Sequence, residues 1–394
     1  MKIDPVLPSL DLAHAEAPDL HQLIDSTRDR GPVVPVRYHD AIAYLVTGYD
    51  EVRAAFGDEE NFESAAFYRI HAEPSQGRTL QSMIGKEHKT NRALVSRAFL
   101  PRQVEDYVEG LITEEALRRI EIFAGSTEVD LVESFTRPFP FSVITRLLGL
   151  PIQDEPQFLG WALKLIDHPW DPEGALRARR EFTDYLQPVL NAARADRCEG
   201  LLSTLAHAEI DGSRLEDEEI FAFCRQLFPA GSDTAFKNLG SLLTAILTTP
   251  GMRELACGSD SDRADLVQEG LRWEAPVALQ PRACSRDTVL GGVEIAAGSA
   301  MLFGVTAANH DAKIFEDPHR FDPSRPNKHQ HLAFGYGEHF CLGSHLARRE
   351  LERALKLLFE RFPHMALVPG SRTEILGCVI RGPAELHVRL AGHN

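Results

Sequence analysis

Residues 331–345, His-Leu-Ala-Phe-Gly-Tyr-Gly-Glu-His-Phe-Cys-Leu-Gly-Ser-His, place one cysteine in a glycine-rich turn that is followed by a helix-like stretch. Gly335, Gly337 and Gly343 give the backbone the freedom that a tight loop or a flat ligand requires. A helix that begins after Cys341 would point free N–H groups at the sulfur, lower its pKa and favour the thiolate. Such a thiolate is either a metal ligand or a nucleophile, and the loop alone leaves both roles open.

Size and composition are those of an ordinary globular protein. The chain has 394 residues, of which 43% are hydrophobic and 25% charged, and it contains no repeat or low-complexity linker. We therefore expect a single domain over residues 1–394 with a core large enough to enclose a cofactor. The net charge of -16 argues against a nucleic-acid partner.

Cysteine spacing and hydropathy indicate whether the chain has zinc sites, disulfides or membrane-spanning segments. The six cysteines, at positions 198, 224, 257, 284, 341 and 378, show no CxxC spacing, which indicates neither a zinc site nor a disulfide framework. The start, Met1 to Pro5, has no apolar segment, and no run of about 18 apolar residues follows. These features predict a cytoplasmic protein without a membrane anchor.

Helical patterns dominate the middle of the chain. Residues 33–48 read as two short strands around a turn at His39-Asp40, and a second group of short strands is expected over 276–305. Residues 58–85 show no sustained period and are predicted to form a long loop. Helices are expected over residues 50–56, 87–99, 103–124, 141–149, 155–167, 173–195, 217–248 and 265–273 and after Cys341.

The longest helical pattern, residues 217–248, is interrupted by Pro229-Ala230-Gly231-Ser232-Asp233-Thr234. Proline costs ~3 kcal/mol and glycine ~1 kcal/mol inside a helix, so the pattern predicts a local break or distortion. Elsewhere, His88 and Arg92 are four residues apart and share one helix face, as a site for an acidic ligand would require. Glu269 and Arg272, three apart, can form a bidentate pair.

The pattern Phe334-x-x-Gly337-x-His339-x-Cys341-x-Gly343 resembles the haem-ligand loop of the cytochrome P-450 superfamily, in its soluble bacterial form. The other motifs match that family in the same order along nearly the whole chain. The resemblance implies a mainly α fold with a small β lobe, from about 30–48 and 276–305, that encloses haem b with Cys341 as the iron ligand. The residues expected at the haem are His88, Arg92, Ala230, Gly231, Arg282, Phe334, Gly335, His339, Cys341 and Gly343.

By the same resemblance, the protein is a monooxygenase that inserts one atom of O2 into a C–H bond, in hydroxylation or oxidative dealkylation. Asp233 and Thr234 would supply an acid and a hydroxyl beside the bound oxygen. The connection at residues 168–173 would belong to a mobile helix pair that covers the substrate entrance. The expected substrate is a small, largely apolar organic molecule, and the residues expected to line its pocket are Phe67, Tyr68, Ile70, Leu227, Phe228, Val277, Leu279 and Ile380.

Electrons would come from NAD(P)H through a ferredoxin, because the chain carries no flavin or dinucleotide motif. The basic cluster Arg348, Arg349, Arg353 and Lys356 could dock this acidic carrier, and we expect a monomer. The resemblance also implies a buried ion network in which a third residue joins Glu269 and Arg272. Arg320 is the first choice for that residue and Arg325 the second.

Three alternatives are distinguishable. A peroxygenase driven by hydrogen peroxide should lack the acid and alcohol pair that Asp233 and Thr234 provide. A haem-thiolate sensor or ligand carrier would bind haem without activating oxygen. A structural protein with a buried thiol would be colourless.

Overall fold

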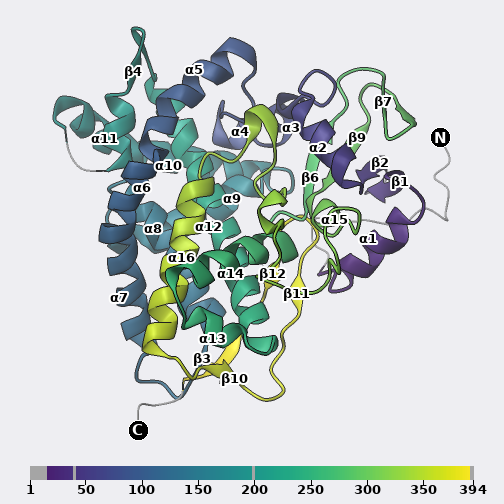
Figure 1. Ribbon diagram of the computed structural model, residues 1–394. Helices are drawn as coiled ribbons and strands as arrows, with labels where there is room; N and C mark the ends of the chain where they lie inside the picture. The colour runs from purple at the N-terminus through teal and green to yellow at the C-terminus, as the bar shows by residue number, and fades with distance from the viewer. Residues whose placement is uncertain (1–15, 39–40, 198–199, 391–394) are drawn as a thin grey trace.

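The computed structural model describes residues 16–38, 41–197 and 200–390. Helices make up most of the molecule, and the strands of residues 33–46 and 279–304 gather in a smaller part at one side (Figure 1). The prediction of a mainly α fold with a small β lobe is confirmed. None of the helices in these ranges is both long and apolar enough to cross a membrane.

The β lobe is built on a four-stranded sheet of order β1-β2-β9-β6. Strands β2 and β9 run parallel with Val46 opposite Phe303, while the β1–β2 and β6–β9 pairs are antiparallel. The predicted strands of both segments are confirmed, and the turn predicted at His39-Asp40 lies outside the described residues. The strands of this sheet are β1 (Val33–Tyr38), β2 (Ala41–Val46), β6 (Leu279–Ala283) and β9 (Ala300–Gly304).

The helices of the described ranges enclose one large hydrophobic core. In order they are α1 (Leu20–Arg28), α2 (Tyr49–Gly57), α3 (Ser64–His71), α4 (Glu73–Gln76), α5 (Gly85–Ser96), α6 (Pro101–Tyr107), α7 (Thr113–Phe123), α8 (Pro138–Leu147), α9 (Glu155–Ile166), α10 (Pro172–Ala195), α11 (Leu201–Ala206), α12 (Asp217–Thr248), α13 (Met252–Ala256), α14 (Asp260–Trp273), α15 (Val305–Asn309) and α16 (Ser344–Arg361).

In the described part of the chain, the remaining strands form a three-stranded sheet of order β10-β13-β3 and the two-stranded ribbons β4–β5, β7–β8 and β11–β12. They are β3 (Glu128–Asp130), β4 (Glu209–Ile210), β5 (Ser213–Arg214), β7 (Thr288–Leu290), β8 (Val293–Ile295), β10 (Ala366–Leu367), β11 (Ile375–Leu376), β12 (Gly382–Pro383) and β13 (His387–Arg389).

The segment 58–85, predicted as a long loop, contains helices α3 and α4. Their eight and four residues are shorter than the 11–18 residues over which helical periodicity is readable. Ser64 and Ala65 on α3 are nevertheless fully buried, so packing against the rest of the protein stabilises this short helix.

Helix α12 continues through Pro229 without the predicted break. Its start carries a capping box between Glu216 and Glu219, and residues such as Leu242 and Leu243 are fully buried. Burying two such side chains contributes roughly 1.5–3 kcal/mol each, which offsets the ~3 kcal/mol that an interior proline costs. The helix therefore runs through the core as one 32-residue element.

Candidate functional site

The Cys341 loop has the strained backbone that its glycines predict. Gly335 and Gly337 adopt φ values of +70° and +79°, and a Cβ atom on Gly337 would lie 2.8 Å from the Phe56 carbonyl oxygen. The Cys341 N–H donates to the Phe334 carbonyl at 2.9 Å, and α16 starts three residues later. The predicted turn from glycine loop into helix is confirmed.

The Cys341 thiol differs from expectation in its acidity. Desolvation raises its pKa, and this effect exceeds the opposing effects of the Gly343 N–H, Arg92 and Arg348. The residue is nevertheless exposed, so a ligand can reach it. The prediction of a lowered pKa is wrong for the free thiol, and binding of a metal cation to the sulfur would favour its thiolate.

His88 on α5 is buried without a hydrogen bond. Its side chain is 1% exposed, and neither ring nitrogen has a partner among the described residues. Burial, with His339 and Arg92 nearby, lowers its pKa to about 4, so the ring is neutral at pH 7. An unsatisfied buried polar group costs ~1–3 kcal/mol, and the His88 ring is therefore suited to hydrogen-bond a bound group.

Two arginines complete this side of the site. Arg92 donates to the Phe340 carbonyl at 2.5 Å and so ties α5 to the Cys341 loop. Arg282 on β6 is 6% exposed, its Nη1 donates to the Pro281 carbonyl at 2.9 Å, and its guanidinium stacks against aromatic rings such as that of Tyr68. A buried guanidinium with most of its donors uncommitted to acceptors among the described residues is a strong candidate to bind an anion.

His339 lies beside His88, with the ring centroids 4.3 Å apart, and its Nε2 is 3.5 Å from a Glu59 carboxylate oxygen. A pocket of about 370 Å³ opens here, and its lining residues are His88, Lys89, Arg92, Ala93, Ser96 and Glu338. Arg92 lies close enough to shift the pKa values of both His88 and Cys341, and Arg282 shifts that of Glu59, which His339 contacts. These contacts link a thiol, two guanidinium groups and an unsatisfied imidazole across α5, β6 and the loop. This donor set fits a metal cofactor that carries carboxylates, as haem b does.

The middle of α12 has an exposed residue and polar side chains next to each other. Ala230 is exposed although its neighbour Pro229 is buried, and the Thr234 hydroxyl donates to the Ala230 carbonyl at 2.7 Å. Burial raises the pKa of Asp233, while Lys237 and Arg137 oppose the shift. Sequence reasoning missed these two cations, although the spacing of Lys237 four residues after Asp233 was available as a signal.

Gly231 has a different neighbour from the one expected. A Cβ atom at this position would lie 2.7 Å from Ile144 Cδ1 on α8. Because the side chain of Ile144 occupies this space, the absent Cβ serves the close packing of α8 on α12. The expected place of Gly231 at the haem stays a prediction.

The predicted pocket lining divides into two groups. Phe228 and Leu279 are 0% exposed within the hydrophobic core, so the prediction that they line the pocket is wrong. Phe228 packs against other aromatic rings, and such all-aromatic burial cannot be distinguished from pocket lining in a sequence. The residues that keep accessible surface are Phe67, Tyr68, Ile70, Leu227, Val277 and Ile380.

Within that second group, Val277 and Ile380 are joined by an antiparallel bridge, and the Tyr68 hydroxyl accepts from Gln280 Nε2 at 2.7 Å. These two contacts place the start of β6, and the residues just before it, beside the C-terminal hairpin and α3. Ile70 is 66% exposed, which makes it the outermost of the set.

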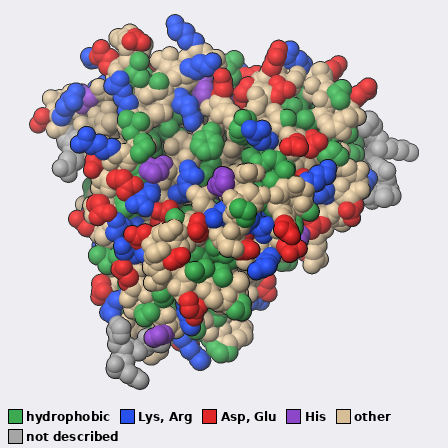
Figure 2. Space-filling model, in the orientation of Figure 1, with side chains coloured by type: hydrophobic (Ala, Val, Ile, Leu, Met, Phe, Trp, Pro, Cys, Tyr) green, Lys and Arg blue, Asp and Glu red, His purple; other side chains and the backbone are tan. Residues whose placement is uncertain are grey.

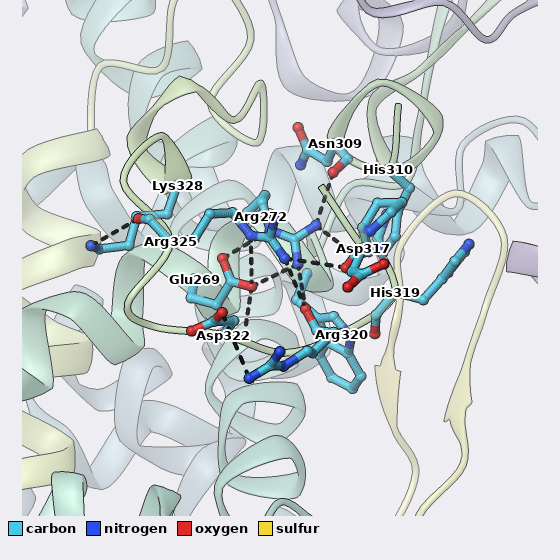
Figure 3. Close-up of polar contacts among 12 residues, drawn as sticks. Glu269, Arg272, Asn309, His310, Asp317, His319, Arg320, Asp322, Arg325 and Lys328 are labelled. Carbon is cyan, nitrogen blue, oxygen red and sulfur yellow. Dashed lines mark hydrogen bonds and ion pairs between the residues drawn. The ribbon is translucent and has the colours of Figure 1, made fainter. Parts of the chain in front are cut away.

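The buried ion network forms around Glu269 and Arg272, both 0% exposed on α14 (Figure 3). The carboxylate accepts from Arg272 Nε at 2.8 Å and from Nη2 at 2.7 Å. Arg325 is 6% exposed, and its Nε lies 3.6 Å from Glu269 Oε1. The Arg320 side chain is 70% exposed and contributes only its carbonyl, which accepts from Arg272 at 3.2 Å.

The choice of Arg320 is therefore wrong, and Arg325, the second choice, supplies the third charged group. The two arginines are five residues apart in an irregular segment, where no periodicity indicates which side chain turns inward.

The expected basic cluster on α16 is largely neutralised. Arg349 binds Glu105 through two hydrogen bonds of 2.7 and 2.9 Å, and Arg353 pairs with Glu109. Lys356 lies 3.4 Å from Asp260, and Arg348 stacks over the Phe334 ring. Among the described residues, three of the four predicted cations, Arg349, Arg353 and Lys356, have a carboxylate partner. Figure 2 likewise shows basic and acidic side chains interleaved on the face in view.

The chain is similar to known proteins over most of its length. Residues 264–375 match the family described as Cytochrome P450. The 6-deoxyerythronolide B hydroxylase of Saccharopolyspora erythraea is 32% identical over 396 residues, covering 95% of this chain and 96% of the relative. The vitamin D(3) 25-hydroxylase of Pseudonocardia autotrophica is 33% identical, covering 89% and 88% of the two chains.

The crystal structure of the cytochrome P450 enzyme CYP109B1 from Bacillus subtilis matches with a TM-score of 0.81 and 32% identity, covering 93% of this chain and 98% of that one. The similarity thus extends over the α-helical body, the β lobe and the Cys341 loop together. The chain belongs to the cytochrome P450 family and is a haem b-binding monooxygenase of the bacterial type.

Proposed function

We propose that this enzyme hydroxylates a C–H bond of a small, largely apolar organic molecule, with electrons from NAD(P)H delivered by a ferredoxin. Two relatives are named as hydroxylases, and one matching structure is titled as a complex with testosterone. The accessible Phe67, Val277 and Ile380 side chains favour a substrate of the same apolar kind.

In this proposal Cys341 holds the haem iron, and His88, Arg92, Arg282 and His339 bind the haem carboxylates. The His88 ring, unsatisfied by the described residues, and the buried Arg282 guanidinium support these roles. The bound haem supplies the oxidation of the substrate by O2.

The observation that carries the proposal is the Asp233-Thr234 pair beside the exposed Ala230. The Thr234 proton is committed to the Ala230 carbonyl, so its oxygen is left as an acceptor for a protonated group at that surface. Desolvation raises the pKa of Asp233, and Lys237 lies near it, which supports a role for this carboxyl group in accepting and returning a proton. We assign proton delivery to these two residues.

The test reconstitutes the enzyme with NADPH, a ferredoxin reductase and a ferredoxin, after candidate substrates are screened for a low-spin to high-spin haem shift. Asp233→Asn should lower product formation by roughly 10²-fold, the usual range for loss of a general acid. Thr234→Ala should leave NADPH consumption largely intact while product falls. Cys341→Ala should abolish the red-shifted Soret band of the reduced carbon monoxide complex.

A peroxygenase would behave differently. Turnover with hydrogen peroxide would then be far faster than turnover with ferredoxin, and Asp233→Asn would not slow it. That pair of results would replace the monooxygenase proposal.

We also propose that ferredoxin docks over the Cys341 loop. Because the α16 cations are paired, the local charge is weak, and the exposed Tyr336 and Phe340 rings offer apolar contact instead. Phe340→Ser should therefore raise the apparent KM for ferredoxin while leaving the substrate-induced spin shift unchanged. An unchanged KM in this variant would place the docking face elsewhere.

A further inference from the structure

Three histidines from distant parts of the chain meet beside the Arg272 network. His21 is on α1, His310 directly follows the last residue of α15, and His319 follows Pro318 in the loop before Arg320. The His310 ring centroid lies 4.5 Å from that of His21 and 5.0 Å from that of His319. One ring nitrogen of each residue lies within 4.8 Å of those of the other two.

His310 has the strongest requirement for a partner. Its side chain is 1% exposed, its Nδ1 lies 3.0 Å from the Thr306 carbonyl, and its Nε2 has no partner among the described residues. A carbonyl only accepts, so Nδ1 carries the proton and Nε2 keeps a free lone pair. Burial lowers the pKa of His310 well below its usual value, which keeps the ring neutral.

The other two histidines each contact a carboxylate through one ring nitrogen. His21 Nε2 lies 2.9 Å from Glu274 Oε2, and His319 Nε2 lies 2.9 Å from Asp25 Oδ2. Because a carboxylate accepts, each Nε2 is a donor, and each Nδ1 then has a lone pair to offer in the neutral ring. Histidines that bind metal ions almost always donate their other N–H to a carboxylate or a carbonyl in this way.

The surrounding structure holds the three histidines in place. Arg272 Nη1 donates to the carbonyls of Asn309 at 3.0 Å and Pro318 at 2.8 Å, the residues that directly precede His310 and His319. Arg28, on the same helix as His21, donates to the His310 carbonyl at 3.0 Å. Figure 3 shows His310 and His319 on the side of the Arg272 network opposite Lys328.

The charges nearby permit a cation. Glu274 also binds Arg381 at 2.8 Å, and Asp25 also binds Arg28 at 3.2 Å, so each carboxylate offsets one arginine. Three protonated imidazoles would repel one another at these distances, whereas one divalent ion shared by three neutral rings uses every free lone pair. Imidazole nitrogens favour Zn²⁺ among the common divalent ions.

We propose that His21, His310 and His319 form a binding site for Zn²⁺ that fastens α1 to the loops beside the Arg272 network. In a tetrahedral site with Zn–N distances of about 2.0–2.1 Å, the nitrogens are about 3.3 Å apart. The His319 side chain is 54% exposed and can close the remaining distance by rotation. Its exposed edge leaves the fourth coordination position to water.

The test uses haem-replete protein without an affinity tag, stripped with EDTA and titrated with ZnCl₂ by calorimetry. Wild type should bind one Zn²⁺ per chain, His319→Ala should bind it at least tenfold more weakly, and His21→Ala/His319→Ala should lose this site. His329→Ala removes an exposed histidine outside the cluster and is the matched control, with unchanged affinity. Equal affinity in wild type and the double variant would overturn the proposal.

Zinc-edge X-ray absorption of the one-equivalent complex provides a readout that is independent of enzyme activity. Three imidazole nitrogens at about 2.0–2.1 Å are expected, with one fewer in His319→Ala. A shell of oxygen atoms without imidazole scattering would place the ion elsewhere and also overturn the proposal. The carbon monoxide spectrum of each variant confirms that the haem site is intact.

Discussion

Arg272 and His88 are both almost completely buried, but they differ in how far their hydrogen bonds are satisfied. The five N–H donors of Arg272 meet five acceptors, two on Glu269 and one carbonyl each from Asn309, Pro318 and Arg320. The two ring nitrogens of His88 meet none within residues 16–38, 41–197 and 200–390. A saturated network stabilises the fold by itself, whereas unsatisfied groups beside a thiol and a pocket are retained at a cost that a ligand can repay.

The saturated network should give the largest effect when it is broken. Arg272→Ala leaves the Glu269 carboxylate buried without its cation and should lower the free energy of unfolding by about 3–5 kcal/mol. Denaturant titration of the holoprotein measures this loss.

Two control variants test whether Arg325 or Arg320 is the third charged member of the Glu269–Arg272 network. Arg325→Ala should cost about 1–3 kcal/mol, because hydrogen bonds to the carbonyls of Asp317 and Arg320 are lost. Arg320→Ala keeps the backbone carbonyl and should change stability by less than about 0.5 kcal/mol. A larger loss in Arg320→Ala than in Arg325→Ala would contradict the assignment of the network.

A second unsatisfied group, Glu350 on α16, tests the cost of burial away from the pocket. Its side chain is 3% exposed, its Oε1 has no partner among the described residues, and desolvation raises its pKa to about 8. Because the folded-state pKa exceeds the unfolded value of 4.5, the folded protein binds the proton more tightly. Stability is therefore full below about pH 4.5 and is lost as the pH rises toward 8.

At pH 7 this loss amounts to roughly 3 kcal/mol, at 1.36 kcal/mol per pH unit. Glu350→Gln cannot ionise and should abolish this part of the pH dependence, so that the variant is the more stable protein at pH 7–8 and similar at pH 4.5. Unfolding midpoints of both proteins measured across pH 4.5–8 check the slope. Parallel slopes would show that Glu350 stays ionised in the folded protein.

Replacing His88 should stabilise the haem-free protein and weaken the binding of haem. Replacing it with Phe removes two unsatisfied nitrogens, so the haem-free protein should gain about 1 kcal/mol, while haem should leave roughly tenfold faster. Haem transfer to apomyoglobin measures the second effect, and denaturation of the apoprotein the first. His329→Phe, at an exposed position, is the control, and a destabilised apoprotein with unchanged haem loss would show that His88 is only a packing residue.

Features that depend on residues close together in the sequence could be predicted, whereas features that depend on distant residues could not. The Cys341 loop, the paired strands and the Glu269–Arg272 pair are local patterns, in which turn glycines, alternation and three-residue spacing carry the information. The neutralising partners of the α16 cations are not local, since Glu105 lies 244 residues before Arg349. For the same reason no short sequence motif indicates the His21–His310–His319 cluster. Its members are far apart in the sequence and come together only through tertiary packing.

Burial is the other quantity that the sequence does not contain. It reverses the expected direction of the Cys341 pKa, and it removes Phe228 and Leu279 from the pocket lining. It also keeps α12 continuous through Pro229, where propensity alone predicts a break.

Gly231 gives the smallest expected effect, because two contributions oppose each other there. Alanine gains about 1 kcal/mol in helix propensity, but its Cβ atom would lie 2.7 Å from Ile144 Cδ1, the mobile end of a side chain. Gly231→Ala should therefore change the unfolding free energy by less than about 1 kcal/mol. In the background of Ile144→Val, which removes that methyl group, the same substitution should stabilise by about 1 kcal/mol, and the double-mutant cycle isolates the contact. If the cycle gave no coupling while Gly231→Ala altered the substrate-induced spin shift, the glycine would serve the ligand rather than the packing of α8 on α12.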